Sequence, residues 1–279
     1  MESAAKLKRL LKVVLLAIVA GLAILFVAIR VIENRLIYFP PRYPEGFPPP
    51  QTYEGDVDDV WLQTSDGVKI NAFYRSNPAS KQLLLWFHGD AENIGYDLPH
   101  LRRLAKIGVN ILAVDYRGYG RSEGSPDEAG VYRDAVAAYD YLINQRHFRA
   151  QDIIIYGHSL GGAVAVNLAS RRQCGGLIVQ SSFTSAPAMA QRMFAIPFLG
   201  YAAKSRFNSL QKIRSVHAPI LIVHGTRDKV VPFAMGQQLF AAAPEPKHFY
   251  SIEGAGHNDL MEAGGENYLG YLRTFVAGL

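Results

Sequence analysis

The stretch IIIYGHSLGGAVAVNLA, residues 153–169, decides the fold of this chain. Its first four residues are a short apolar run typical of a buried strand, and the alanine-rich part from Leu160 onward is typical of a helix. The letters between them, GHSLG, fit the pattern G-x-S-x-G, in which a sharp turn from strand to helix holds a serine in a strained, exposed position. We therefore interpret Ser159 as a candidate nucleophile. The other residues of this elbow are Gly157, His158 and Gly161.

Similar short apolar runs recur along the chain, and each ends in glycine or polar residues. They cover residues 83–88, 111–114, 177–180, 220–224 and 248–252, with segments of helical period between most of them. Two alternating stretches around Asp66-Gly67 predict a β-hairpin in front of these units. Alternating strands and helices predict an α/β fold with a mostly parallel central sheet and helices on both faces. Such sheets place their sites beyond the carboxyl ends of the strands, where the polar residues gather here.

Residues 57–279 resemble the α/β-hydrolase superfamily. The resemblance rests on HGDA at residues 88–91, on DYRGYGRS at residues 115–122 and on the elbow itself. Within the superfamily the chain is most similar to the small, minimally capped members with an N-terminal anchor and an apolar lead-in, here LIYFP at residues 36–40. Those members are serine esterases and include protein depalmitoylases and lysophospholipases. The resemblance implies the α/β-hydrolase fold and a serine esterase activity.

A serine nucleophile needs a base in contact, and the base needs an orienting acid. In the superfamily the acid and then the histidine follow the serine in chain order. Asp228, just past the apolar run at 220–224, has the place and the local motif that the resemblance implies for the acid. His257 follows the last apolar run in a glycine-containing turn that allows the imidazole to reach Ser159, so it is the expected base.

Two backbone N–H groups are needed to stabilise the oxyanion of a tetrahedral intermediate. Leu160, directly after the nucleophile, is expected to supply one of them. The resemblance implies that Asp90, which follows His88-Gly89, supplies the other. An acidic side chain is unfavourable beside a developing oxyanion, so we expect the Asp90 carboxylate to be turned away or paired.

The N-terminal segment predicts a membrane anchor. Residues 10–32 are apolar and are interrupted only by Lys12 and Arg30. A helix of this length covers about 34 Å and can span a bilayer as one transmembrane helix; a cleaved signal peptide is the alternative. Residues 1–9 form a basic tail before it. Because more basic residues precede the span than follow it, we expect a cytoplasmic N-terminus and an extracytoplasmic catalytic domain.

Residues 33–56 are rich in proline and predict an extended spacer between the anchor and the hydrolase domain at residues 57–279. Within that domain, residues 183–216 are too few for a bulky lid and predict a short helical cap with an apolar underside. This underside either packs on the domain or forms an acyl-chain groove that faces the bilayer. Together with the anchor, the groove would favour lipidic or acylated substrates.

The net charge of +5 indicates a membrane partner rather than a nucleic acid. Residues 1–42 hold seven basic and two acidic groups, so the rest of the chain sums to zero. No basic tract with interleaved aromatic residues follows, which argues against a nucleic-acid partner. No metal is expected, because the histidines lack metal-ligand spacing, and no cofactor is expected, because no cofactor-binding loop is recognisable.

The leading hypothesis is a serine hydrolase that cleaves carboxylic ester or thioester bonds through an acyl-enzyme on Ser159. A serine peptidase of the same fold, such as an aminopeptidase, is the alternative, although such enzymes usually have larger caps. A catalytically silent, membrane-bound interaction domain is a third hypothesis from a different class, since a fold does not prove activity. Dehalogenase and epoxide hydrolase chemistry requires an aspartate where Ser159 stands and is excluded.

Overall fold

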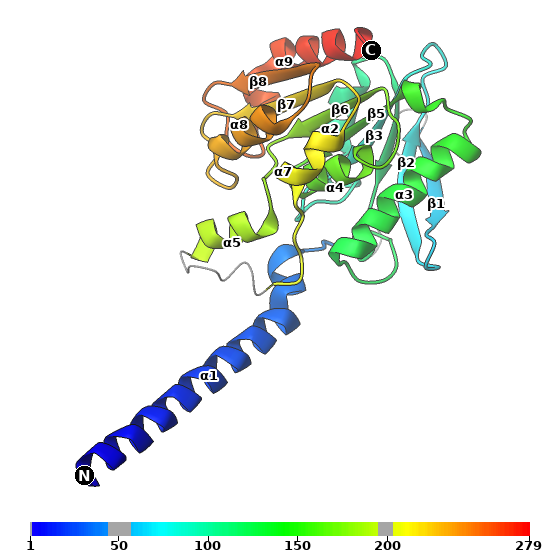
Figure 1. The fold of residues 1–279 in the computed structure, drawn as a ribbon. Coiled ribbons are helices and arrows are strands. Elements are labelled where there is room, and N and C mark those ends of the chain that lie inside the picture. The colour runs from blue at the N-terminus through cyan, green and yellow to red at the C-terminus, as the bar shows by residue number, and fades with distance from the viewer. Residues whose placement is uncertain (1, 44–56, 195–202) are drawn as a thin grey trace.

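The computed structural model describes residues 2–43, 57–194 and 203–279, and an eight-stranded sheet forms its centre (Figure 1). The strand order is β1-β2-β4-β3-β5-β6-β7-β8. The predicted hairpin consists of β1 (Val57–Gln63) and β2 (Lys69–Arg75), and β2 also pairs antiparallel with β4 (Asn110–Val114). All further neighbours in this order pair in parallel. Besides β4, these strands are β3 (Leu83–Phe87), β5 (Ile153–His158), β6 (Gly176–Gln180), β7 (Ile220–Gly225) and β8 (Lys247–Ile252). The predicted α/β fold with a mostly parallel sheet is confirmed.

Helices cover both faces of this sheet. One face is covered by α3 (Glu128–Asn144), α4 (Leu160–Ala169) and α8 (Phe233–Ala242), and the other by α2 (Leu98–Ala105) and α9 (Leu260–Ala277). Successive residues of a strand therefore enter different cores: Leu85 of β3 packs with the first group of helices and Trp86 with the second. Strands buried on both sides read as continuous apolar runs, which explains why the sequence signals their positions so clearly.

A short cap follows β6 in the predicted region. It contains α5 (Ala186–Phe194) and α7 (Ser209–Lys212), and residues 195–202 between them lie outside the described part of the chain. Met189 of α5 packs against the core, whereas the side chain of Met193 is 65% exposed. The apolar residues of α5 are thus divided between the domain and the surface.

The N-terminal helix α1 (Glu2–Ile37) projects away from the domain (Figure 1). Its apolar stretch has a mean hydropathy of 2.9 and is not buried, and among the described residues α1 is the one helix long and apolar enough to cross a membrane. It includes the predicted anchor at 10–32 and continues beyond it, so residues 33–37 are helical rather than the start of an extended spacer. Residues 44–56 of the predicted spacer lie outside the described residues.

A buried carboxylate attaches the end of α1 to the cap. Glu33 is 5% exposed and accepts hydrogen bonds from the backbone N–H groups of Lys204 and Ser205. One turn later, Tyr38 is also buried and packs edge-on against Phe207, with 6.3 Å between the ring centroids. These contacts are the reason that the helix does not end where the apolar span ends.

The chain after α1 runs along the carboxyl edge of the sheet. The Phe39 N–H donates to the carbonyl oxygen of Asp90 at 3.2 Å, and the Pro41 carbonyl oxygen accepts from the Gly120 N–H at 3.0 Å. The segment that leads from the helix is therefore bound to the loops that follow β3 and β4.

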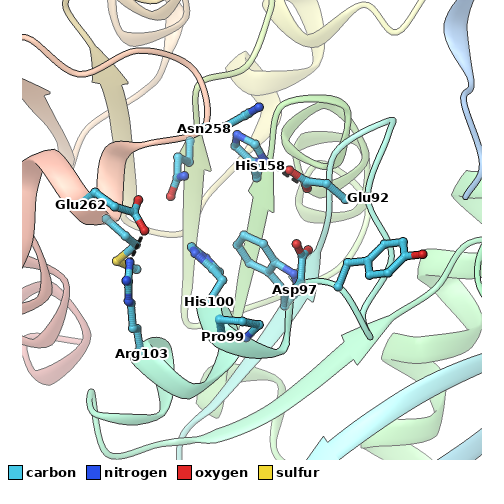
Figure 2. A pocket seen from close by; sticks show the side chains of 12 residues that line it. Glu92, Asp97, Pro99, His100, Arg103, His158, Asn258 and Glu262 are labelled. Atoms are coloured by element: carbon cyan, nitrogen blue, oxygen red, sulfur yellow. Dashed lines mark hydrogen bonds and ion pairs between the residues drawn. The ribbon is translucent and has the colours of Figure 1, made fainter. Parts of the chain in front are cut away.

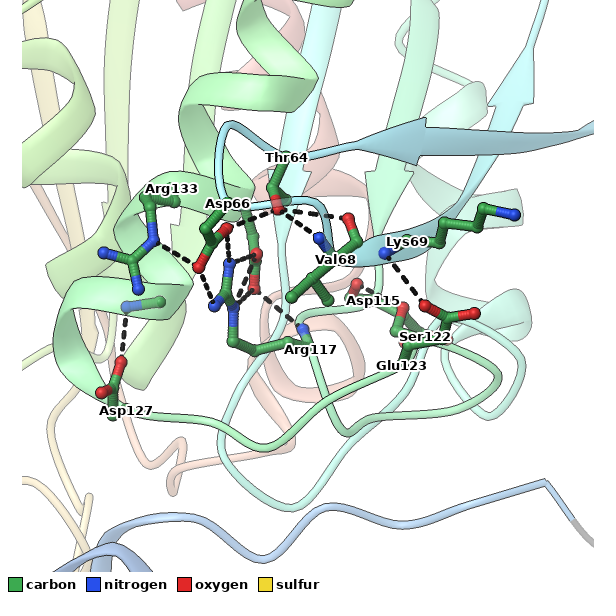
Figure 3. Close-up of polar contacts among 12 residues, drawn as sticks. Thr64, Asp66, Val68, Lys69, Asp115, Arg117, Ser122, Glu123, Asp127 and Arg133 are labelled. Carbon is green, nitrogen blue, oxygen red and sulfur yellow. Dashed lines mark hydrogen bonds and ion pairs between the residues drawn. The ribbon is translucent and has the colours of Figure 1, made fainter.

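The DYRGYGRS motif fixes the hairpin to the rest of the domain through Arg117. Its guanidinium lies 2.8 Å from Asp66 in the β1–β2 turn (Figure 3) and 2.8 Å from Asp134 in α3. The Arg117 N–H also donates to Asp134 at 2.8 Å. Because Asp134 is fully buried, its charge needs this set of partners, and removal of either partner would leave an uncompensated charge in the core.

Alanine at position 33 removes the acceptor from two backbone N–H groups. We expect Glu33→Ala to lower the free energy of unfolding by about 2 kcal/mol, which corresponds to a fall in melting temperature of roughly 4–8 °C for a domain of this size. Thermal unfolding of the detergent-solubilised full chain measures this change. Arg35→Ala, at an exposed position of the same helical turn, is the control and should stay within about 0.5 kcal/mol of the wild type. Equal melting temperatures for the two variants would contradict a role of Glu33 in holding the helix to the cap.

Candidate active site

The elbow forms where β5 ends at His158 and α4 begins at Leu160. Ser159 between them has a φ of 52° and a ψ of −116°, a conformation that costs on the order of 1–3 kcal/mol for a residue with a side chain. Hydrogen bonds on both sides maintain it. The Ser159 N–H donates to the carbonyl oxygen of Gln180 at 2.9 Å, and the Ser159 carbonyl oxygen accepts from the Ser182 hydroxyl at 2.7 Å. The neighbouring strand β6 and the loop after it therefore support the strained turn.

Two glycines allow the backbone to pack closely enough for this turn. A Cβ atom on Gly157 would lie 2.0 Å from the Gly161 carbonyl oxygen, and one on Gly161 would lie 2.1 Å from the Phe87 carbonyl oxygen. No side chain fits at such distances. The second contact also places the end of β3 directly against the elbow, so the HGDA loop that follows β3 lies beside Ser159.

Ser159, His257 and Asp228 lie in hydrogen-bonding contact although they follow three different strands. The Nε2 atom of His257 is 3.0 Å from Ser159 Oγ, and its Nδ1 atom is 2.7 Å from Asp228 Oδ2. A carboxylate accepts hydrogen bonds, so Nδ1 bears the proton and Nε2 is the nitrogen able to take a proton from the serine. The contacts are those that a serine nucleophile, a histidine base and an orienting acid would require.

The surroundings of Asp228 keep its carboxylate ionised. Its Oδ1 atom accepts from the N–H groups of Val230 and Val231 at 2.9 and 2.8 Å, and His224 Nε2 lies 3.3 Å from Oδ2. Burial opposes the charge, but the hydrogen bonds from His224, His257 and the backbone together hold the pKa of Asp228 well below its usual range. The acid therefore stays charged throughout the neutral range and can orient the imidazole.

The two expected oxyanion donors belong to the helix that starts at the elbow and to the loop after β3. Leu160 opens α4, where the positive end of the helix dipole lies. Asp90 belongs to the loop that is pressed against the elbow, and its carbonyl oxygen accepts from the Phe39 N–H at 3.2 Å and from the Tyr119 hydroxyl at 2.8 Å. The loop is thus held by the segment that follows α1 and by Tyr119.

The side chain of Asp90 interacts with its own backbone N–H, the group expected to bind the oxyanion. Burial, together with the negative charge of Glu92, raises the pKa of Asp90, while the backbone N–H and the positive charge of His158 act in the other direction. An ionised Asp90 would compete with an oxyanion for this N–H. The raised pKa lessens that competition because it favours the neutral acid.

The neighbours of His158 come from parts of the chain that no sequence motif connects. Glu92 accepts from the Gly89 N–H at 2.7 Å and lies 3.3 Å from His158 Nδ1. Glu92 and His158 are 66 positions apart, and no motif relates them. In the sequence, His158 is only the first variable position of the G-x-S-x-G motif. Its contact with the Glu92 carboxylate is found only in the structure.

A polar cavity of about 190 Å³ lies next to this pair (Figure 2). Trp86 Nε1, Asp97 Oδ2 and His100 Nε2 line it and have no hydrogen-bond partner among the described residues. Burial raises the pKa of Asp97 to about 7 and lowers that of His100 to about 4. The cavity is large enough for several water molecules, and polar atoms such as these are their usual partners.

Within the described part of the chain no cluster of histidine, cysteine and acidic residues is placed to hold a metal ion.

Comparisons with known proteins agree with this architecture. Residues 78–214 match the family described as serine aminopeptidase, S33. The chain is 34% identical to the uncharacterized protein Rv2307c of Mycobacterium tuberculosis, over 95% of this chain and 93% of the relative. It is 36% identical to the alpha/beta hydrolase domain-containing protein 17B of Homo sapiens, over 79% of this chain and 75% of the relative. The solved structure of the Pyrococcus furiosus esterase Pf2001 covers 85% of this chain and 95% of its own with a TM-score of 0.71, and its 22% identity supports the fold alone.

Alanine at position 161 would place a methyl group against the Phe87 carbonyl. We expect Gly161→Ala to destabilise the domain by at least about 3 kcal/mol, because the end of β3 must move away from the elbow. Gly270→Ala in α9 is the matched control: a Cβ there meets nothing within 4 Å, and alanine should stabilise the helix by up to about 1 kcal/mol. Melting curves followed by circular dichroism compare the two variants. A wild-type melting temperature for Gly161→Ala would argue against the close backbone contact.

Proposed function

The chain belongs to the α/β-hydrolase superfamily, and from this premise we propose that it is a serine hydrolase that cleaves carboxylic ester or thioester bonds. Ser159 is the nucleophile, His257 the base and Asp228 the orienting acid. The observation that supports this assignment is the continuous contact from Ser159 Oγ through His257 to Asp228, with distances of 3.0 and 2.7 Å.

The reaction follows from this geometry. Ser159 Oγ attacks the carbonyl carbon while His257 Nε2 takes the hydroxyl proton, and the carbonyl oxygen becomes an oxyanion that the N–H groups of Leu160 and Asp90 stabilise. His257 then returns the proton to the departing oxygen or sulfur, which leaves an acyl group on Ser159. Water attacks this ester with His257 again as the base, and the acid product and free Ser159 are regenerated. Asp228 remains ionised throughout and stabilises the imidazolium that forms in each half-reaction.

The proposed substrates are lipidic or acylated molecules at a membrane. The apolar helix α1 supports anchoring by its length and hydropathy. Its end is tied to the cap through Glu33, and the following segment reaches the Asp90 loop through Phe39. The side of the domain that bears Ser159 is therefore the side from which the anchor leaves. The excess of basic residues before the span supports a cytoplasmic N-terminus with the domain on the other side.

A serine peptidase is the second candidate, because the family that matches residues 78–214 is described as a serine aminopeptidase. The same three residues would serve peptide cleavage. The short cap argues against it, because a peptide substrate needs a surface that selects a chain end.

The deciding experiment uses the full chain in detergent. We expect a fluorophosphonate probe to label the wild type and not Ser159→Ala, and p-nitrophenyl ester turnover to fall by about 10³-fold or more in the variant. Esters of increasing chain length, and aminoacyl arylamides in parallel, separate a lipid-type substrate from a short ester and from a peptide. Folded wild-type protein that neither reacts with the probe nor cleaves any of these substrates would favour a silent interaction domain.

The charge of Asp90 gives a further prediction for the same assay. Asp90→Asn removes the carboxylate that competes for the oxyanion donor, so we expect kcat at pH 8 to rise roughly 3- to 10-fold. The gain should be smaller at a lower pH, because burial raises the pKa of Asp90 and the wild-type side chain therefore becomes neutral at a higher pH than an ordinary aspartate. Glu266→Gln, an exposed carboxylate on α9, is the control. A lower kcat for Asp90→Asn at both pH values would contradict the competition.

A further inference from the structure

Glu92 and His158 form a continuous link between two loops of the candidate site. Glu92 Oε2 accepts from the Gly89 N–H at 2.7 Å and lies 3.3 Å from His158 Nδ1, a contact drawn in Figure 2. On the other side of the ring, His158 Nε2 lies 3.2 Å from the carbonyl oxygen of His257. The link therefore runs from the loop after β3, through the residue before the nucleophile, to the backbone of the base.

The partners of His158 determine its protonation. A carboxylate oxygen and a backbone carbonyl oxygen are acceptors only, and a neutral imidazole has a single N–H to donate. Both contacts can be hydrogen bonds only if both ring nitrogens carry protons. His158 is consequently a cation in this arrangement, and Glu92 is the anion that compensates it.

The pair is shielded from solvent. The side chain of His158 is 6% exposed and that of Glu92 is 26% exposed. The groups that face His158 are Glu92 and Asp90 from the loop after β3, Asp97 and His100 from the region of α2, and His257, whose ring centroid is 5.1 Å away. Glu92 is the carboxyl in contact with His158, so its negative charge directly compensates a positive charge at this position.

We propose that Glu92 and His158 are a positioning pair. The buried imidazolium of His158 holds the carbonyl of His257, and the carboxylate of Glu92 holds the Gly89 N–H. The pair thereby fixes the distance between His257 and the loop after β3. The inference rests on the proposed function for its kinetic consequence but not for its structural content. The turn that contains His257 follows two glycines, Gly254 and Gly256, whose backbone has a wide range of allowed conformations. A fixed His257 carbonyl limits where the imidazole can lie, and misplacement of a reacting group by about 1 Å can cost a factor of about 100 in rate.

The protonation of His158 can be measured without any substrate. In full-length protein labelled with ¹⁵N-histidine, the ring signals that disappear in His158→Gln belong to His158. We expect two protonated ring nitrogens at pH 7.5. Burial opposes the charge, but the Glu92 carboxylate, the His257 carbonyl and Asp97 raise the pKa of His158 to about 9. The cation is thus present at neutral pH and is lost as the pH rises through about 9. A neutral imidazole at pH 7.5 would overturn the proposal.

Kinetics test the positioning role. The glutamine in His158→Gln can hydrogen-bond only one of the two partners of His158, either Glu92 or the His257 carbonyl. Glu92→Gln keeps the shape of the Glu92 side chain but removes its negative charge. We expect each to lower kcat about 10- to 100-fold, with KM changed less than about threefold. The double variant should be little worse than either single variant, because the two residues act as one unit. His217→Gln, at an exposed position before β7, is the matched control and should leave kcat unchanged.

The pH profile distinguishes positioning from general stability. Wild-type kcat should fall as the pH rises through about 9, and this alkaline limb should be absent in His158→Gln. Melting temperatures measured alongside identify any variant that is merely unfolded, and Glu92→Gln then provides the independent test. Single variants with wild-type kcat, or losses that simply add in the double variant, would overturn the proposal. A wild type that shows the imidazolium but cleaves no ester would count against the proposed function and leave the pair intact.

Discussion

At Ser159 the backbone adopts a φ of 52° between a central strand and a helix, and the rest of the site depends on how that turn is held. The turn requires three backbone segments to approach more closely than side chains permit, at Gly157, at Gly161 and at the end of β3. The two parallel neighbours of β5 support the turn: the end of β3 packs against Gly161, and Gln180 of β6 accepts from the Ser159 N–H. The sheet thus supplies both the position of the nucleophile and the support for its strain.

The positions of the proposed base, His257, and the proposed acid, Asp228, follow from the same geometry. β7 and β8 pair in parallel up to Gly225 and Ile252, so their loops leave the sheet side by side. The Arg227 N–H donates to the Ala255 carbonyl at 2.9 Å, which joins the loop of Asp228 to the loop of His257 before their side chains meet. Residues distant in sequence are brought together because consecutive parallel strands end at one edge.

The sequence was sufficient for features that depend on pattern and order. Strands buried on both faces produce apolar runs, and chain order after Ser159 left few candidates for the acid and the base, which lie in contact in the structure. Features that depend on individual side-chain contacts could not be predicted. Glu33 looked like the first residue of a spacer, and nothing in its neighbours indicates that it is buried against Lys204 and Ser205. The contact between Glu92 and His158 likewise depends on how two loops pack, which no local motif encodes.

The attachment of α1 limits how the catalytic domain can move once the helix is embedded in a bilayer. A domain joined to its anchor by a flexible linker samples all orientations relative to the membrane, so its active site is near the membrane surface only part of the time. Here Glu33, Tyr38 and Phe39 tie the helix to the cap and to the loop after β3, which removes most rotation about the junction. The fold then determines the distance of Ser159 from the lipid headgroups and the orientation of the domain, whereas a flexible linker would allow both to vary. With the lipidic substrates proposed above, an enzyme built this way would meet them by their two-dimensional diffusion within the bilayer. A version cut after α1 would have to reach the same substrates by three-dimensional diffusion from solution.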